Sequence, residues 1–356
     1  MFGREVTESE RELISLPIRE GGLGLRNVSL NADRSYRASS QITRLLIQHI
    51  IEQSDDLPDA PQEYQDKKAT LTEQKTFETT RATTIKSQQT AELQRTLDQF
   101  SQPGASSWLG ALPIAAQGFD LNKGEFQDAL CMRYLMPIRN LPSHCPCGSK
   151  FDQTHALNCM RGGFVNARHN NIRDFECQLL QSICTDVESE PHLQPVQNKN
   201  TYTTSANTDD NARLDIRARG FWRRGQNAFF DVRVTNPDNV SQQNTRLESV
   251  LKKHETEKKR KYNRRVMEVE HGSFTPLVFT TSGVMSHECS KFHKALAEKI
   301  SQKKDERYDT IMRYLRVKLS FLALKSTLLC LRGTRRGRGN LGSGEDFGFT
   351  LDELGL

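Results

Sequence analysis

The spacing of apolar residues changes from a helical period to a strand period near residue 210. In the N-terminal part, the segment QITRLLIQHII has apolar residues at helical spacing, and residues 164–188 predict one amphipathic helix. Farther along, the runs ARLDIRARG and NAFFDVRVTNP alternate apolar with polar residues, as β-strands do, and FWRRGQ between them suits a hairpin connection. A basic helix is expected over about 243–269, followed by a strand in TPLVFTTSG and a helix from Ser286.

The order helix, strand, strand, helix, strand, helix over residues 164–330 predicts an α/β domain with a small mixed sheet and flanking helices. The chain before it is expected to be mainly helical. Within that part, residues 52–107 are polar, with too few apolar positions for a core. We therefore divide the chain into five parts: a helical region (1–55), a polar helical linker (56–107), a helix with a Cys/His segment (108–163), the α/β domain (164–330) and an Arg/Gly-rich tail expected to be disordered (331–356).

The composition favours a modest core with exposed segments. The hydrophobic fraction of the 356 residues is 35%, and the mean hydropathy is −0.66. The net charge of +6 is compatible with a nucleic-acid partner but does not require one. We expect neither a secretion signal nor a membrane partner, because no apolar stretch is long enough for either. Clustered cysteines then indicate a metal site rather than disulfides.

Three cysteines and a histidine lie close together in the segment HCPCGSKFDQTHALNC. Pro146 and Gly148 suit a tight turn around the first two cysteines, and the histidine and the last cysteine are four apart, on one face of a helical turn. Zinc takes four such ligands in a tetrahedron, and so short a segment has no core of its own. The sequence predicts a structural zinc site, with His144 as a substitute ligand, formed by Cys145, Cys147, His155 and Cys159.

Asp215 and Asp231 are expected in the middle of two neighbouring strands. A carboxylate between apolar strand residues needs a reason, and two carboxylates that face one cleft suit Mg²⁺. Such an ion polarises a phosphodiester and activates water. Arg233 projects from the same strand face as Asp231, where a cation can stabilise charge on phosphate. Taken alone, the two acids are equally compatible with surface positions in an ordinary hairpin.

Basic residues gather in the segment KKHETEKKRKYNRR. On a helix they make a positive face suited to a phosphate backbone, although basic runs also occur on solvated helices. The cations of this segment are Lys252, Lys253, Lys258, Lys259, Arg260, Lys261, Arg264 and Arg265. Arg223 and Arg224 beside Trp222 form a second candidate, since an aromatic next to Arg can stack on a base, although Trp222 can equally cap the core. The tail adds Arg332, Arg335, Arg336 and Arg338, which suit nonspecific nucleic-acid affinity.

The two acids and the following cation resemble the PD-(D/E)XK motif of restriction-endonuclease-like domains. The first half departs from the motif because LD stands in place of PD, and Arg233 occupies the usual lysine position. An arginine cannot be deprotonated, so it cannot act as a base, but it can bind phosphate. The resemblance implies that Asp215, Asp231 and Arg233 are catalytic.

The same resemblance implies two further groups. Lys258 or Lys259 on the following helix is a candidate for a displaced lysine. A carboxylate from the preceding helix is also expected, for which Glu176 is the first candidate and Glu190 the second. His169, at the start of the predicted helix, is interpreted as structural.

REGGLGLRN resembles the end of the reverse transcriptase region of non-LTR retrotransposons. A zinc knuckle followed by a restriction-like endonuclease resembles the C-terminus of their site-specific, early-branching members, and the resemblance is strongest over residues 141–285. It implies nicking of target DNA so that the element's RNA is reverse transcribed from the exposed 3′ end. It also implies structural Zn²⁺, catalytic Mg²⁺ or Mn²⁺, DNA and element RNA as partners, and a nuclear location. No paired-Asp polymerase motif is present, so polymerase activity is not expected.

Two functions remain open from the sequence. The first is a metal-dependent DNA endonuclease, and the second is a catalytically inactive nucleic-acid-binding module derived from one. Both predict salt-sensitive DNA binding. Only the first predicts that strand breaks require a metal ion and both acids.

Overall fold

The computed structural model describes residues 2, 4–25, 27–54, 60–239, 241–242 and 244–335, with the side chains of residues 60–66 left aside. The chain forms two compact units, residues 1–101 and residues 102–356, and we describe each by itself. Within the described residues, no helix combines the length and the apolar character that crossing a bilayer requires. Arg336 and Arg338 of the predicted tail lie outside the described residues.

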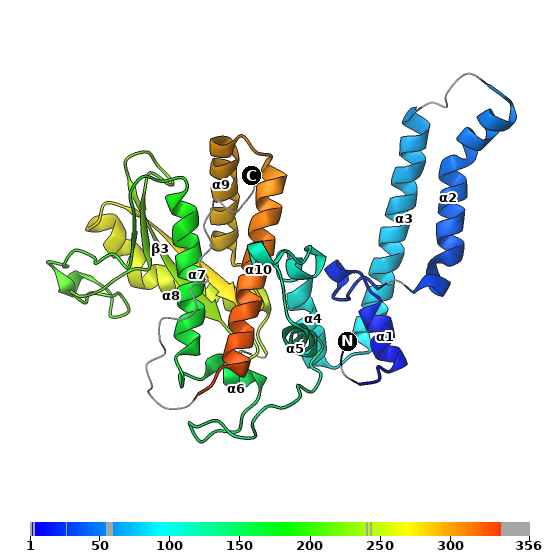
Figure 1. Cartoon of the computed structure of the whole chain (residues 1–356). Helices are drawn as coiled ribbons and strands as arrows, with labels where there is room; N and C mark the ends of the chain where they lie inside the picture. Colours follow the sequence, from blue (N-terminus) through cyan, green and yellow to red (C-terminus); the bar gives the residue numbers. More distant parts are fainter. Residues whose placement is uncertain are drawn as a thin grey trace. The chain divides into compact units, whose positions relative to one another are not determined.

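The first unit is helical (Figure 1). Its elements are α1 (Glu8–Ile14), η1 (Ile18–Glu20), α2 (Val28–Ile51), α3 (Ala60–Ser87) and α4 (Ala91–Ser101). The turn after η1 requires glycine at two positions for steric reasons. Gly21 has a φ of +96°, and a Cβ at Gly22 would lie 1.9 Å from the carbonyl oxygen of Leu16, so neither position accepts a side chain without strain.

The predicted polar helical linker over residues 56–107 is indeed largely helical, with many exposed side chains. Its helices α3 and α4, however, belong to the first unit and do not form a connection between units. Ala82, Ile85 and Leu97 are buried in this unit. Ala82 and Ile85 lie in the last two turns of α3, and Leu97 lies within α4. The low apolar content of the whole segment therefore did not reveal that these few residues are buried.

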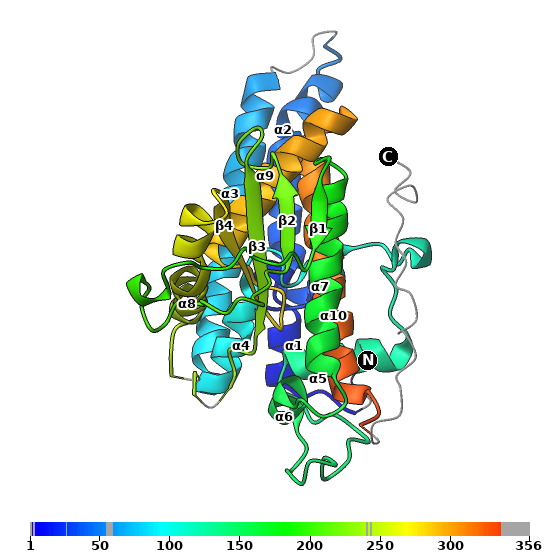
Figure 2. The same ribbon diagram turned by 90° about the vertical axis from the view of Figure 1, so that its left-hand side faces the viewer.

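The second unit is built around a four-stranded mixed sheet, which confirms the predicted combination of helices with a small mixed sheet. Its elements are η2 (Ser107–Gly110), η3 (Ala115–Gln117), α5 (Lys123–Arg133), α6 (Gln153–Asn158), α7 (Phe164–Gln181), β1 (Val187–Ser189), η4 (Lys199–Thr201), β2 (Ile216–Arg219), β3 (Asn227–Thr235), α8 (Leu247–Glu268), β4 (Ser273–Thr280), α9 (His287–Lys304) and α10 (Tyr308–Arg332). The strand order is β1-β2-β3-β4 (Figure 2). The first three strands are antiparallel, and α8 connects β3 to the parallel strand β4.

Helices cover both faces of this sheet (Figures 1 and 2). Alternate residues of β3 point to opposite faces, as in any strand. Phe230 and Val232 pack with α7, α9 and α10 on one face. Phe229 packs with Val266 of α8 on the other face. Asp231 therefore belongs to the face that α8 covers.

Three predicted boundaries are wrong. The helix expected over residues 164–188 ends at Gln181, and the short edge strand β1 follows it. Asp215 lies one residue ahead of β2 instead of in mid-strand. The helix expected from Ser286 is confirmed as α9, with Ser286 as its N-cap. The next helix, α10, includes the first two residues of the tail predicted from residue 331, so that boundary is wrong. The segment 108–163 is also no separate domain, because α10 contacts η2, α5, α6 and α7 within one unit.

A buried ion pair joins α7 to α9. Glu176 is 0% and His293 1% exposed, and the Glu176 Oε1 atom lies 2.8 Å from His293 Nε2. The other ring nitrogen lies 2.9 Å from the carbonyl oxygen of Cys289. Burial lowers the pKa of His293, but the Glu176 carboxylate outweighs this effect, so the pKa is raised. The protonated imidazole is the form that the fold stabilises.

We predict that Glu176→Gln lowers the free energy of unfolding by about 2 kcal/mol at pH 6 because it removes one partner of a buried pair. A raised histidine pKa contributes stability that is complete below the unfolded value of 6.5 and is lost as the pH rises through the folded value. The difference between the wild type and the variant is therefore expected to shrink from pH 6 to pH 9 in urea unfolding. Glu298→Gln, at an exposed position of α9, is the control. A difference that stays constant with pH would contradict the ion pair.

Candidate functional site

The predicted zinc ligands meet in one cluster. The ligand atoms of Cys145, Cys147, His155 and Cys159 all lie within 4.8 Å of one another. The two sulfur atoms of Cys145 and Cys159 are 3.7 Å apart, and Cys147 Sγ lies 3.4 Å from His155 Nε2. Two sulfurs that share a tetrahedral zinc ion at about 2.3 Å are about 3.8 Å apart. The cluster can therefore hold a metal ion such as zinc.

Local structure brings these ligands together. Asp152 caps the short helix α6 by accepting a hydrogen bond of 2.7 Å from the amide of His155, which fixes the helical turn that carries the histidine. Hydrogen bonds from the Ser149 backbone and hydroxyl lower the pKa of Cys147 to about 6, whereas burial raises the pKa of Cys145. His144, the substitute ligand, instead lies 3.2 Å from the Ser143 hydroxyl through its Nδ1 atom.

Two arginines attach the cluster to the rest of the unit. Arg168 of α7 donates a hydrogen bond of 3.2 Å to the carbonyl oxygen of Leu157, and Arg335 donates one of 3.2 Å to that of Ala156. The Arg335 guanidinium also lies 4.9 Å from the ring centre of Phe151 and 5.1 Å from that of Phe164. Arg335 is buried, so its predicted place in an exposed nucleic-acid-binding tail is wrong.

Arg332 is likewise structural. Its guanidinium forms a two-pronged ion pair with Asp128, with distances of 2.6 and 2.7 Å. It also donates to the carbonyl oxygens of Arg139 and Asn140. The end of α10 is therefore fixed to the segment that leads into the metal cluster.

We predict that Cys147→Ser abolishes tight binding of a zinc ion, whereas Cys184→Ser, outside the cluster, retains about one zinc per chain. Cys147 is exposed, so its loss removes a ligand without opening a cavity. The measurement is metal content by mass spectrometry after dialysis against a weak chelator. Equal zinc content in both variants would contradict the assignment of the ligands.

The two predicted acids face each other across β2 and β3. Ile216 pairs with Phe230, and continuing this antiparallel register by one residue puts Asp215 opposite Asp231. The Asp215 Oδ2 atom accepts a hydrogen bond of 2.6 Å from the amide of Val232. Burial raises the pKa of Asp215, but its hydrogen bond with His169 and the other charges near it outweigh this, so the pKa is lowered.

Asp231 is buried, and a lysine from α8 compensates its charge. The Lys258 ammonium is in ion-pair contact with Asp231 Oδ2. Burial raises the pKa of Asp231 to about 6, with the Asp215 charge adding to this effect and Lys258 opposing it. Of the two candidates for a displaced lysine, the structure brings Lys258 to the acids, while Lys259 pairs with Glu288 at 2.7 Å.

The other proposed catalytic residues lie differently. Arg233 is 3.5 Å from Glu257, in an ion pair next to the acids. Glu176 is in the core with His293, so the prediction that it supplies a third carboxylate is wrong. Its helical phase explains this, because it lies four residues from both Ile172 and Leu180 on the buried side of α7. Glu190 pairs with Arg173, and its amide donates a hydrogen bond of 2.8 Å to the carbonyl oxygen of Asp215.

His169, for which the sequence indicates a structural role, lies at this site. Its Nε2 atom lies 3.1 Å from Asp215 Oδ1. The available signal was its phase, three residues before the buried Ile172 on α7. Four side chains thus lie together in the described part of the chain: Asp215 just before β2, Asp231 of β3, Lys258 of α8 and His169 of α7.

The predicted nucleic-acid-binding residues divide into two groups. Arg265 is buried and donates to the carbonyl oxygens of Gln194, Asn207 and Asp209, so its prediction as a DNA contact is wrong. Arg264, although exposed, pairs with Glu268 at 2.9 Å. The other exposed candidates are Lys252, Lys253, Arg260, Lys261, Arg223 and Arg224. Trp222 donates from its Nε1 atom to Thr275 at 3.0 Å, which fits the capping alternative.

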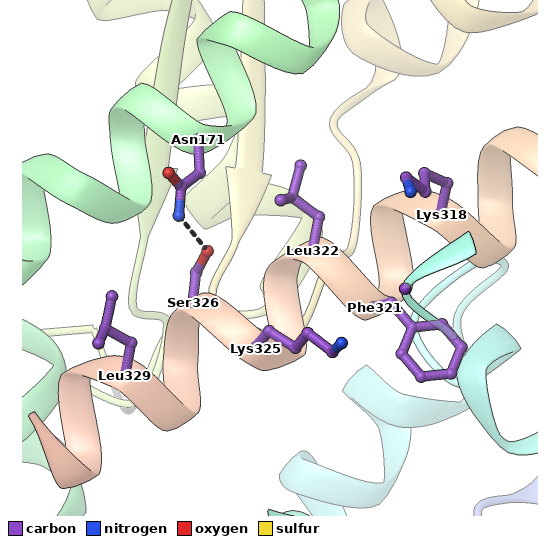
Figure 3. Close-up of a pocket in the computed structure, with 8 residues that line it drawn as sticks. Asn171, Lys318, Phe321, Leu322, Lys325, Ser326 and Leu329 are labelled. Atoms are coloured by element: carbon purple, nitrogen blue, oxygen red, sulfur yellow. Dashed lines mark hydrogen bonds between the residues drawn. The ribbon is translucent and has the colours of Figure 1, made fainter. Parts of the chain in front are cut away.

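Two cavities of this unit differ greatly in size. The first lies along α10, where Asn171 and Ser326 are 3.4 Å apart (Figure 3). Its volume of about 30 Å³ has room for about one water molecule, so it is not a substrate site. A second pocket of about 820 Å³ is lined by α8, α10 and the segment between β4 and α9.

Family models and curated proteins provide no identification of this chain. No family model matches the chain, and no curated protein matches it. The function is therefore inferred from the side chains described above.

Proposed function

We propose that the second unit is a metal-dependent DNA endonuclease of the restriction-endonuclease-like type, which nicks target DNA for retrotransposon integration by target-primed reverse transcription. The observation that carries this proposal is the pair Asp215 and Asp231, opposite each other on adjacent strands, with Lys258 in contact with the buried acid. Exposed cations on α8, the helix that also carries Lys258, support a DNA substrate.

The donor set fits a hard divalent cation. Asp215 and Asp231 would hold Mg²⁺ or Mn²⁺, since these ions prefer carboxylate oxygens completed by water and phosphate. When bound, the ion would polarise the phosphodiester and lower the pKa of an attacking water. Asp231 supports this fit because its charge is compensated by a lysine on a flexible stem, which can yield to a cation, rather than by fixed backbone amides.

The chain's own cations have separate roles in this proposal. Lys258 is half-buried beside the acids and would stabilise the charge that develops on the phosphate. Arg233 remains charged and would bind a neighbouring phosphate oxygen once its ion pair with Glu257 opens. Lys258 thus supplies the lysine of the PD-(D/E)XK motif from a helix, which removes the need for Arg233 to act as one.

The zinc knuckle and the resemblance of REGGLGLRN to the end of a reverse transcriptase region support the retrotransposon origin. DNA, and in this setting element RNA, would be the partners, with a nuclear location. The alternative is an inactive nucleic-acid-binding module derived from such a nuclease. The observation that favours the alternative is arginine at position 233, where the motif carries lysine.

We predict that the full chain nicks supercoiled plasmid in the presence of Mg²⁺ or Mn²⁺ and that Asp231→Asn lowers the rate by about 100-fold or more because an oxygen ligand is lost. DNA affinity, measured by gel shift without divalent ions, is expected to persist in the variant. A wild type that binds but does not nick would establish the inactive module instead.

We predict that Lys258→Met lowers the nicking rate by about 100-fold, the effect of removing one charge that stabilises a transition state. Lys259→Met is the matched control on the same helix, and its rate is expected to stay within about threefold of the wild type. Single-turnover nicking at saturating protein separates this effect from weaker DNA binding. Equal rates for the two variants would argue against Lys258 as the displaced lysine.

The pH dependence follows from Asp231. Its pKa of about 6 means that the carboxyl is protonated at lower pH and unable to bind a divalent cation. At subsaturating Mg²⁺, the nicking rate is therefore expected to rise through about pH 6 and to level off near pH 8. DNA affinity without divalent ions over the same range is the control. A rate that is flat or falls between pH 5 and pH 7 would rule out this role for Asp231.

A further inference from the structure

The pocket of about 820 Å³ has the size of a ligand site rather than of a packing defect. It lies between the N-terminal half of α8, the residues that join β4 to α9, and the first half of α10. Its walls are largely apolar, and the side chains that form them include Leu247, Leu251, Val284, Met312 and Leu315. A flat hydrophobic ring would be well accommodated there.

The mouth of this pocket is mainly cationic. Arg246, Lys252 and Arg316 are exposed and line it, against the single exposed carboxylate of Glu248 and the imidazole of His287. An acid deeper in the pocket does not reverse this balance. Glu255 is buried, accepts a hydrogen bond of 2.7 Å from the amide of Glu288 and lies 3.9 Å from Lys252. The interior is mainly apolar but also contains the buried polar side chains of Glu255 and His293. Such an interior behind a cationic mouth suits a ligand with a flat ring that carries polar edges and an anionic group.

The pocket is next to the candidate cleavage site. Glu255 lines the pocket, and Lys258, which contacts Asp231, is three residues farther along the same helix. Three residues of helix rise about 5 Å, and residues at this spacing are neighbours on one face. A strand with a phosphate at the acids therefore reaches the pocket with a nearby nucleotide, because each nucleotide advances a strand by about 3.4 Å along a duplex axis and by more in an extended single strand.

We propose that this pocket binds one unpaired nucleotide of a single-stranded nucleic acid, with the base between the apolar walls and its phosphate at Arg246, Lys252 and Arg316. A base inside a duplex is stacked and paired and cannot enter a concave pocket, so the occupant must be unpaired. The position of this nucleotide next to a cut rests on the proposed endonuclease function. The binding itself does not.

The test measures binding without cleavage. Fluorescence anisotropy follows a labelled oligo(dT) of about 15 nucleotides, an abasic sugar-phosphate chain of the same length and oligo(U), over a range of salt concentrations. The full chain is used with its zinc retained and without Mg²⁺ or strong chelators. Arg316→Ala removes a cation of the mouth, and its matched control is Arg313→Ala, an exposed arginine of α10 outside the pocket. Met312→Ser removes part of the apolar wall.

We expect Arg316→Ala to lower the slope of log affinity against log salt by about 0.7, the value for one phosphate contact on a single strand, while Arg313→Ala leaves it unchanged. We expect Met312→Ser to weaken oligo(dT) binding by roughly fivefold, without a change in slope and without an effect on the abasic chain. Tighter binding of oligo(dT) than of oligo(U) would identify DNA as the occupant, and the reverse order RNA, with the pocket supported in both cases.

Equal salt slopes for the two arginine variants would overturn the proposal. So would a Met312→Ser variant that loses as much affinity for the abasic chain as for oligo(dT). These binding results are independent of whether the chain nicks DNA. A chain that never nicks can still show the pocket's signature, and a chain that nicks can lack it. Unchanged melting temperatures of the variants exclude unfolding as the cause of a loss.

Discussion

A charged carboxylate that is buried on a central strand needs a compensating charge, and the structure around the candidate site meets this requirement at Asp231. Lys258 satisfies it from α8, which covers that face of the sheet. The adjacent acid, Asp215, is oriented from two sides, by the backbone amide of Val232 and by His169 of α7. The two helices on opposite faces of the sheet therefore each supply one side chain to a single pair of acids. Burying these charges costs folding free energy through lost hydration, and a bound cation or phosphate would offset part of that cost.

The long helix α10 makes the metal cluster and the sheet one structure. It packs against α7 and α9 in the main core and against α5 and α6 near the cluster. Arg168 connects the cluster to the sheet region, because it donates a hydrogen bond to the carbonyl oxygen of Leu157 from the turn of α7 that also carries His169. A Cys/His cluster attached in this way belongs to the same packed unit as the two acids and is not a module on a flexible tether.

The sequence predicted best where the information is local. All four cluster ligands lie in one short segment with its own turn and helix cap, so their spacing alone located the site. The alternation in β3 likewise identified Asp231 as a polar residue among apolar neighbours. Contacts between distant elements could not be read in this way. The partner of Glu176 is 117 residues away, and a helical period gives the buried face of α7 but not the side chain that meets it. The contact of His169 with Asp215 could not be predicted for the same reason, because the two residues are distant in the sequence.

The attachment of Arg335 also sets an order of events during synthesis. Its contact with the carbonyl oxygen of Ala156 spans 179 residues, so the cluster segment leaves the ribosome long before its final neighbour exists. Until α10 has emerged, the thiols of the nascent segment are held near one another only by the local turn and the short helix α6. The second unit consequently completes its packing only when nearly all of the described chain has been made, because α10 closes contacts between residues that are distant in the sequence.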